Sequence, residues 1–185
     1  GRLGREAGDT AAAEASARRA YELLDKLVAE YPTIPRYREN LHHACSELGR
    51  FAYDEGRFEE AAILWGRDWR EASRLADDYP DRPEYTLNLA SASSNYGGVL
   101  VDLARYSEAQ PILKKAIELD EGLAARSPDD RQVRFNLAKT RFNLGYLHLK
   151  RNRFDEAVAE IEKARDLNAT LVAELPDVPR YAHLQ

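Results

Sequence analysis

The segment NLGYLHLKRNRFDEAVAEIEKA, residues 143–164, carries the pattern that decides the fold. Apolar residues recur in it at three- and four-residue spacing on both sides of a short polar break, which is typical of two amphipathic helices joined by a tight turn. Related segments occupy residues 95–116 and 47–68, each 48 residues upstream of the next. A repeat of this length indicates helical units that pack one after another and share a core.

A second motif follows the same period. PTIPRY at 32–37, PDRPEY at 80–85 and PDVPRY at 176–181 are near copies, and PDDRQV at 128–133 is a degraded one. Each copy predicts the start of a helix, because a capping residue follows the first proline, and in the three near copies a second proline then falls in the first turn. The expected N-caps are Thr33, Asp81, Asp129 and Asp177, and the expected first-turn prolines are Pro35, Pro83 and Pro179.

The helix that begins at this motif, here termed helix A, should end near Gly56, Ala104 or Asn152. Glycine and asparagine tolerate the left-handed turn that closes a helix, whereas Ala104 fits it poorly. The second helix, helix B, begins with RFEEA, RYSEA or RFDEA at 57, 105 and 153. The connecting loop is short, so A and B should pack antiparallel. Pro111 should shift or kink the start of its helix B.

These boundaries divide the chain into repeats. The ranges are 1–31 (the C-terminal helix of a truncated repeat, a helix B expected from about Asp9 to Tyr31), 32–79 (repeat 1), 80–127 (repeat 2), 128–175 (repeat 3) and 176–185 (the start of a further repeat). We predict one continuous solenoid domain. The chain contains no methionine and stops inside the last motif, so we expect it to be a piece of a longer protein.

Composition narrows the classes of function. The formal net charge is -5 and the pI is about 5.5, which argues against a global electrostatic grip on nucleic acid or anionic lipid. No apolar run approaches the roughly 20 residues that span a bilayer, so no membrane insertion is expected. Cys45 is the only cysteine, which rules out an intrachain disulfide. The compartment stays open, with the cytoplasm favoured.

Few residues are candidates for a catalytic or metal-binding role. His42 and Cys45 could share a helix face, but no third ligand completes a metal site and Cys45 falls on the apolar stripe. Trp65 and Trp69 fit core packing better than ligand stacking. Asp68 stands where other copies have alanine and is expected to be partly exposed and paired with an arginine. Phosphate loops, nucleophile elbows and paired catalytic carboxylates are absent. We therefore expect no enzyme activity, no cofactor and no metal.

The three quoted segments resemble the tetratricopeptide repeat (TPR). In residues 143–164 the matching positions are Leu144, Gly145, Phe154, Glu156, Ala157, Ile161 and Ala164. The resemblance implies an all-α fold: a right-handed superhelical stack of antiparallel helix hairpins, or TPR-like α-solenoid, that serves as a non-catalytic protein-binding scaffold. The usual unit has about 34 residues, whereas this one has 48. Similar extended units occur in bacterial multidomain proteins, some of which carry a serine/threonine kinase domain.

In this family the A helices line the concave face and hold partner peptides. Carried over, the peptide-binding residues are His43, Ser46, Arg50, Ser94, Asn95, Lys139, Arg141, Phe142, Asn143 and Tyr146. Asn95 and Asn143 match the asparagine that holds an extended peptide backbone. Lys139 and Arg141 would bind carboxylates, because helix A of the third repeat is basic and carries no acidic residue. An extended acidic peptide is thus the expected partner.

Two alternatives stay open. The basic residues could be ordinary solvated surface. The whole chain could also be a structural spacer or a self-association element, forming a homodimer through exposed terminal helices and regulating a catalytic domain elsewhere in the parent chain.

Overall fold

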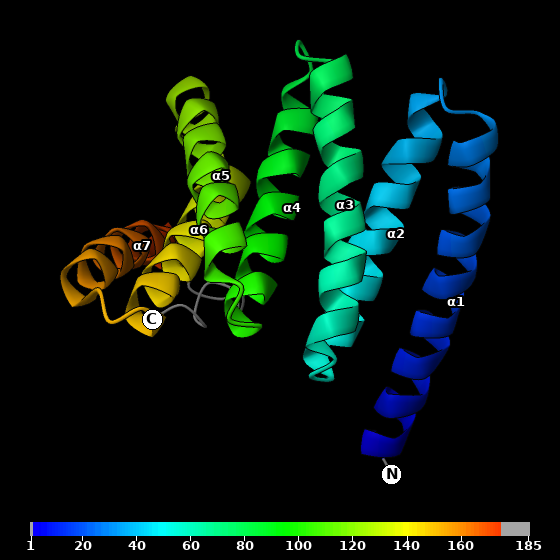
Figure 1. Ribbon diagram of the computed structural model, residues 1–185, viewed down its shortest axis with the longest axis horizontal. Helices are drawn as coiled ribbons and strands as arrows, with labels where there is room; N and C mark the ends of the chain where they lie inside the picture. Colours follow the sequence, from blue (N-terminus) through cyan, green and yellow to red (C-terminus); the bar gives the residue numbers. More distant parts are fainter. Residues whose placement is uncertain (1, 175–185) are drawn as a thin grey trace. The chain divides into compact units, whose positions relative to one another are not determined.

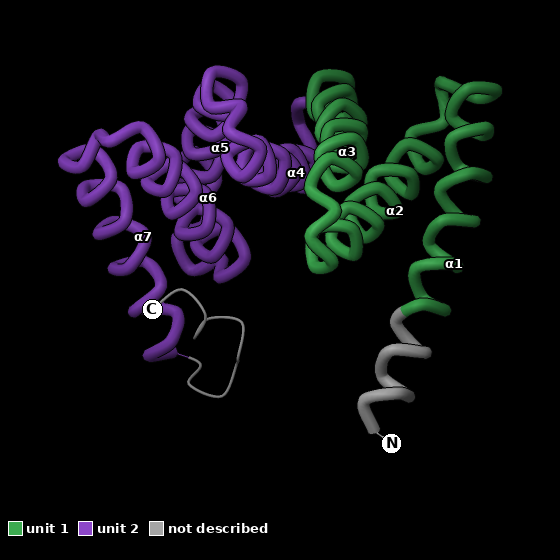
Figure 2. Tube along the Cα trace, turned by 60° about the horizontal axis from the view of Figure 1, so that its bottom comes forward, with its two compact units in different colours: residues 1–79 green, residues 80–185 purple. Residues whose placement is uncertain are grey.

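The computed structural model describes residues 2–174, and the side chains of residues 11–174. Within this part the chain forms seven α-helices and no strand (Figure 1). It divides into two compact units, residues 1–79 and 80–185 (Figure 2). The predicted fold class, an all-α solenoid of helix hairpins, is confirmed.

Consecutive helices pair into hairpins. Unit 1 contains α1 (Arg2–Glu30), α2 (Pro35–Asp54) and α3 (Phe58–Asp78), and unit 2 contains α4 (Pro83–Asp102), α5 (Tyr106–Arg126), α6 (Arg131–Lys150) and α7 (Phe154–Glu174). The pairs α2 with α3, α4 with α5 and α6 with α7 pack against each other, as do α1 with α2. In unit 2, α6 also packs against α5 and α4. The first helix begins at Arg2, earlier than the predicted Asp9.

The helix starts are correctly predicted in position but not in their caps. Pro35 and Pro83 occupy the first turn of α2 and α4 as expected. The caps are Ile34, Arg82 and Asp130, in place of the predicted Thr33, Asp81 and Asp129. Ile34 and Arg82 directly precede proline, which holds them in the extended conformation of an N-cap, whereas Asp130 caps α6 through its side chain. The motif at 176–181, with Asp177 and Pro179, lies outside the described residues.

The predicted left-handed ends of the A helices are confirmed. Gly56, Ala104 and Asn152 have φ values of 74°, 57° and 58°. After each, the next backbone N–H returns to a carbonyl of the last turn, as in the 2.8 Å bond from Arg105 to Leu100. This turn fixes where helix B begins, so α5 starts at Tyr106 despite Pro111. Of the two predicted effects of Pro111, a shift of that start is therefore wrong, and a kink stays a prediction.

A glycine on each helix A lets its helix B approach closely. The pairs are Gly49 with Trp65, Gly97 with Leu113 and Gly145 with Ile161. A Cβ on these glycines would lie 2.4, 2.6 and 2.7 Å from the facing side chain. The leucine-glycine and large-apolar positions of the sequence pattern therefore mark one contact, repeated in every hairpin.

Each unit has its own apolar core. In unit 2, buried side chains from α4, α5 and α6 form one cluster that includes Leu100, Leu113 and Leu147. In unit 1, Val28 of α1 packs with Leu41 and Cys45 of α2. The prediction that Trp65 is a core residue is confirmed, since it is 7% exposed.

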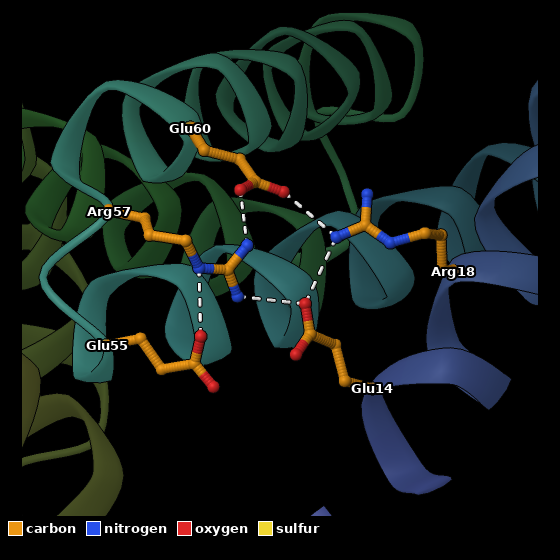
Figure 3. Close-up of polar contacts among 5 residues, drawn as sticks. All are labelled: Glu14, Arg18, Glu55, Arg57 and Glu60. Carbon is orange, nitrogen blue, oxygen red and sulfur yellow. Dashed lines mark hydrogen bonds and ion pairs between the residues drawn. The ribbon is translucent and has the colours of Figure 1, made fainter. Parts of the chain in front are cut away.

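An ion-pair network ties α1 to the α2–α3 turn in unit 1 (Figure 3). Arg57 donates to Glu14 at 2.9 Å, to Glu55 at 3.0 Å and also to Glu60. Arg18 bridges Glu14 and Glu60 at 3.1 and 2.9 Å. The bonds with these carboxylates raise the pKa of Arg57, and the bond with Arg57 lowers the pKa of Glu14. The network thus joins groups more than 40 residues apart in the chain.

Candidate functional site

Polar side chains from α4 and α6 meet along one line in unit 2, which we call the α4–α6 seam. Its members are Ser91, Ser94, Asn95, Asn136, Lys139 and Asn143. Lys139 Nζ donates to Asn95 Oδ1 at 2.5 Å, and Asn143 Nδ2 donates to the backbone oxygen of Ser94 at 3.0 Å. Further along, Asn136 Nδ2 donates to Ser91 Oγ at 2.5 Å. The seam brings together four of the predicted peptide-binding residues.

Small residues on α4 create the room for this seam. A Cβ on Gly98 would lie 2.9 Å from Asn143 Nδ2, so glycine at this position lets the amide lie against α4. The serines of α4 likewise leave the long side chains of α6 in reach of backbone and side-chain oxygens. The sequence therefore specifies short residues on one helix and long amides on its neighbour.

Lys139 differs from the arginines of α6, because its hydrogen-bond partner is the neutral amide of Asn95 and not a carboxylate. Arg134 bonds both oxygens of Glu174 at 2.7 Å, and Arg131 reaches the same carboxylate at 3.3 Å. The bond with Arg134 lowers the pKa of Glu174 to about 2. Burial instead lowers the pKa of Lys139. Its half-buried ammonium is therefore a charge that an external anion could satisfy.

Arg141 points away from the seam. Its guanidinium donates to Glu160 of α7 at 2.7 Å and also to Glu121 of α5, so two helix B residues balance its charge. The basic residues of helix A in the third repeat are thus largely neutralised by its neighbours, which the charge pattern of α6 alone does not reveal. Phe142 beside it is 40% exposed, and the ammonium of Lys150 lies 4.9 Å from the ring centre of Tyr146.

The remaining predicted residues lie on α2 in unit 1. The His43 side chain as a whole is exposed, but its ring lies 4.7 Å from the His42 ring, and partial desolvation of the ring lowers the pKa of His43. The backbone oxygen of Ser46 accepts a 3.1 Å bond from the Trp65 indole. Arg50 pairs with Asp54 at 3.2 Å and lies over the Phe51 ring. The structure does not bring these three residues together with the α4–α6 seam in one unit.

Unit 1 buries a charged cluster that sequence reasoning misjudged. Asp68 is fully buried, and a hydrogen bond joins its Oδ1 to His42 Nδ1. Burial raises the pKa of Asp68, and the bond to His42 opposes this rise. Arg38 donates to buried Glu71 at 2.7 Å. The prediction of a partly exposed Asp68 paired with arginine is wrong, because its partner is a histidine on the facing helix.

A signal for this pair was present in the repeats. The positions 48 and 96 residues after His42 are Ala90 and Ala138, and those after Asp68 are Ala116 and Ala164. Two large polar residues that replace two alanines on facing helices indicate a paired substitution. Burial also raises the pKa of the Cys45 thiol nearby.

Asp120 of α5 was not identified from the sequence at all. It is fully buried, and neither carboxyl oxygen has a hydrogen-bond partner among the described residues. Burial raises its pKa to about 8. Comparison of the repeat copies could have identified Asp120 as unusual, since Ala72 and Asn168 occupy the equivalent positions and neither is charged.

The described residues also bear on two other classes of feature, a metal centre and a membrane-spanning helix. No three histidine, cysteine, aspartate or glutamate side chains there are grouped as metal ligands would be. No helix in residues 2–174 combines the length and apolar character needed to cross a bilayer.

The family model of the tetratricopeptide repeat matches residues 90–122 and 138–170. The predicted resemblance is confirmed for these two segments, which cover most of the α4–α5 and α6–α7 hairpins. The third resembling segment, residues 47–68, lies outside the match. Tetratricopeptide repeats are generally non-catalytic modules of protein interaction, and no catalytic family is indicated.

Solved structures of distant sequence are also similar. MamA, residues 41 to the end, from Desulfovibrio magneticus RS-1 is 15% identical with a TM-score of 0.42, over 91% of this chain and 90% of that one. YrrB, described as a TPR protein with an unusual peptide-binding site, is 16% identical with a TM-score of 0.34, over 93% and 84%. BtubC from P. vanneervenii is 16% identical with a TM-score of 0.29, over 85% and 90%. No curated protein matches the chain.

Proposed function

We propose that this chain is a non-catalytic protein-interaction module that binds an extended acidic segment of a partner along the α4–α6 seam. The two tetratricopeptide repeats at 90–122 and 138–170 support the class of function. The acidic character of the partner is argued from the charges of the seam.

The observation that carries the proposal is that the Lys139 ammonium is half-buried and bonds a neutral amide in place of a carboxylate. It is half-buried, it donates to the neutral amide of Asn95, and burial lowers its pKa. A carboxylate placed beside it would restore the favoured charged form and make a charge-assisted hydrogen bond. Asn95 accepts from Lys139 and Asn143 donates to the Ser94 backbone. In this proposal the remaining atoms of their amide groups bond the peptide backbone.

Arg141 is left out of the proposed contact. Its two carboxylate partners already satisfy it, and a peptide would have to displace Glu160 or Glu121 to reach it. Its role in this proposal is to hold α6 against α5 and α7. Phe142, which is exposed next to the seam, is a better candidate for an apolar contact with the partner.

The test uses a fluorescein-labelled peptide of alternating glutamate and alanine, and its glutamine counterpart, in fluorescence anisotropy titrations. We expect the glutamate peptide to bind, and Lys139→Ala to weaken it at least about tenfold. Raising NaCl from about 50 to about 500 mM should weaken binding to the parent protein in the same direction.

Lys115→Ala is the matched control, because it removes the same charge from an exposed position on α5. Circular dichroism verifies that both variants remain helical. Equal affinity for the two peptides, or equal affinity of Lys139→Ala and Lys115→Ala, would contradict the proposal. The structural spacer would then be the better description of the chain.

A further inference from the structure

Unit 2 contains a cavity of about 310 Å³ where the start of α4, the end of α5 and the start of α6 meet. Its apolar wall is made by Leu87, Leu123 and Val133. Glu84, Arg126 and Ser127 also line it and are exposed, so its mouth reaches solvent. The volume is at the low end of the range for ligand sites, about 300–1,000 Å³, and suits one side chain better than a cofactor.

The cavity lies outside the part of the repeat that matches the tetratricopeptide model. Its lining residues fall before residue 90 or between residues 122 and 138, and the matches cover 90–122 and 138–170. It is therefore built by the additional helical turns of this chain. The peptide-binding seam, by contrast, lies mostly inside the matched segments.

Comparison of the repeat copies explains why space is left here. At the α1–α2 junction the positions equivalent to Ser127 and Val133 are Tyr31 and Tyr37, whose rings meet edge to face with centres 6.1 Å apart. The α3–α4 junction also has tyrosine at both positions, Tyr79 and Tyr85. Among the junctions within residues 2–174, α5–α6 is the one whose sequence has small side chains at both positions, and the cavity lies at this junction.

We infer that this cavity is a docking pocket for a tyrosine side chain of a partner protein. Tyrosine occupies both equivalent sequence positions at two other junctions, and the rings of Tyr31 and Tyr37 contact each other, so an aromatic ring is the occupant that this junction lacks. The polar edge of a phenol also suits the mouth, because its hydroxyl can donate to the Glu84 carboxylate and accept from the Arg126 guanidinium. Asp130 is engaged in capping α6, with bonds of 2.8 and 3.2 Å to Gln132 and Val133.

That the ring comes from a protein rests on the proposed function, whereas the capacity of the pocket for a phenol ring does not. The test therefore uses p-cresol, which is the tyrosine side chain alone. It carries no carboxylate, so its binding is independent of Lys139. The tyrosine-free acidic peptide reports on the seam and p-cresol on the pocket, and the two proposals fail separately.

The measurement is a titration of the isotope-labelled chain with p-cresol, followed by amide chemical shifts. We expect saturable shifts at Leu123, Ser127 and Val133, with a dissociation constant of about 1–10 mM. Val133→Tyr and Ser127→Tyr restore the tyrosines of the other junctions and should weaken p-cresol binding at least about tenfold. Ser107→Tyr, at the opposite end of α5, adds the same ring without filling the pocket and should bind as the parent does.

The absence of saturable shifts at these amides in the parent protein would overturn the inference. So would unchanged p-cresol affinity in the tyrosine variants. If Val133→Tyr disturbs the fold, which amide dispersion reports directly, the exposed position of Ser127 makes Ser127→Tyr the deciding variant.

Discussion

At the scale of single residues, Asp120 has the least favourable environment for a charge. Its carboxyl group is enclosed by the unit 2 core with no hydrogen-bond partner in the described residues, and burial holds its pKa at about 8 instead of 3.8. Because the folded pKa lies above the unfolded one, the folded state keeps a proton that the unfolded state has already lost. The free energy of unfolding therefore falls as the pH rises from about 4 through about 8.

We predict that Asp120→Asn removes this loss. The change copies Asn168 at the equivalent position, and above pH 8 the variant should be more stable than the parent by about 1–3 kcal/mol. At about pH 4, where the buried group is protonated, the two should be close. Urea unfolding at a series of pH values measures this. Glu118→Gln on the exposed side of α5 is the control, and parallel pH profiles for Asp120→Asn and the parent would contradict the argument.

Contacts between individual side chains were the part of the structure least predictable from the sequence. The seam residues Asn95, Lys139 and Asn143 could be placed on neighbouring A helices, because the repeat aligns them. The direction of Arg141 could not, since it depends on glutamates of α5 and α7 that lie about 20 residues away on either side. The helical period predicts which face of a helix a residue occupies, but not which neighbouring side chain it will contact.

At the scale of the element, the helix ends depend on one backbone conformation. Gly56, Ala104 and Asn152 all adopt positive φ, but at Ala104 the Cβ makes this conformation strained. We predict that Ala104→Gly raises the free energy of unfolding by about 1 kcal/mol and that Gly56→Ala lowers it by a similar amount. An added Cβ at Gly56 meets no atom within 4 Å, so backbone strain alone would be responsible.

Urea unfolding can follow the two variants separately. Trp65 and Trp69 are the only tryptophans and both lie in unit 1, so their fluorescence reports on Gly56→Ala. Far-ultraviolet circular dichroism records the helices of both units and so includes the unfolding of unit 2 in Ala104→Gly. A loss of stability in Ala104→Gly would mean that the left-handed turn is not the limiting strain at this junction.

Element boundaries were predictable to the degree that backbone chemistry fixes them. Prolines set the starts of α2 and α4, and the left-handed residues set the ends of the A helices. The caps of α2 and α4 lie one residue after the capping side chains of Thr33 and Asp81, because proline imposes an extended conformation on the residue directly before it. Where arginine replaces proline, at α6, an aspartate side chain does cap.

At the scale of the whole molecule, the two units depend on different contacts. Unit 1 relies on the network around Arg57, which spans α1, α3 and the turn before it (Figure 3). We predict that Arg57→Ala speeds amide hydrogen exchange in α1 several-fold and leaves α4 to α7 unchanged, because stability is local in repeat proteins. Hydrogen exchange with mass spectrometry resolves the helices.

Arg105→Ala is the matched control for this experiment. Arg105 is the equivalent residue 48 positions later, and its carboxylate contacts are with Glu108 of its own turn, at 2.7 and 2.8 Å. It should therefore change exchange only near the start of α5. If exchange in α1 is the same in Arg57→Ala and the parent, the network does not hold α1 in place.

The glycine on each helix A has a consequence for how such a chain can diversify. It sets the distance between the two helices of a hairpin, while the facing residue only has to fill the remaining space, and tryptophan, leucine and isoleucine all do so here. The distance between the helices therefore does not depend on which side chain faces the glycine. Copies of the unit can accumulate different side chains, and so different binding surfaces, while the distance between their two helices stays the same.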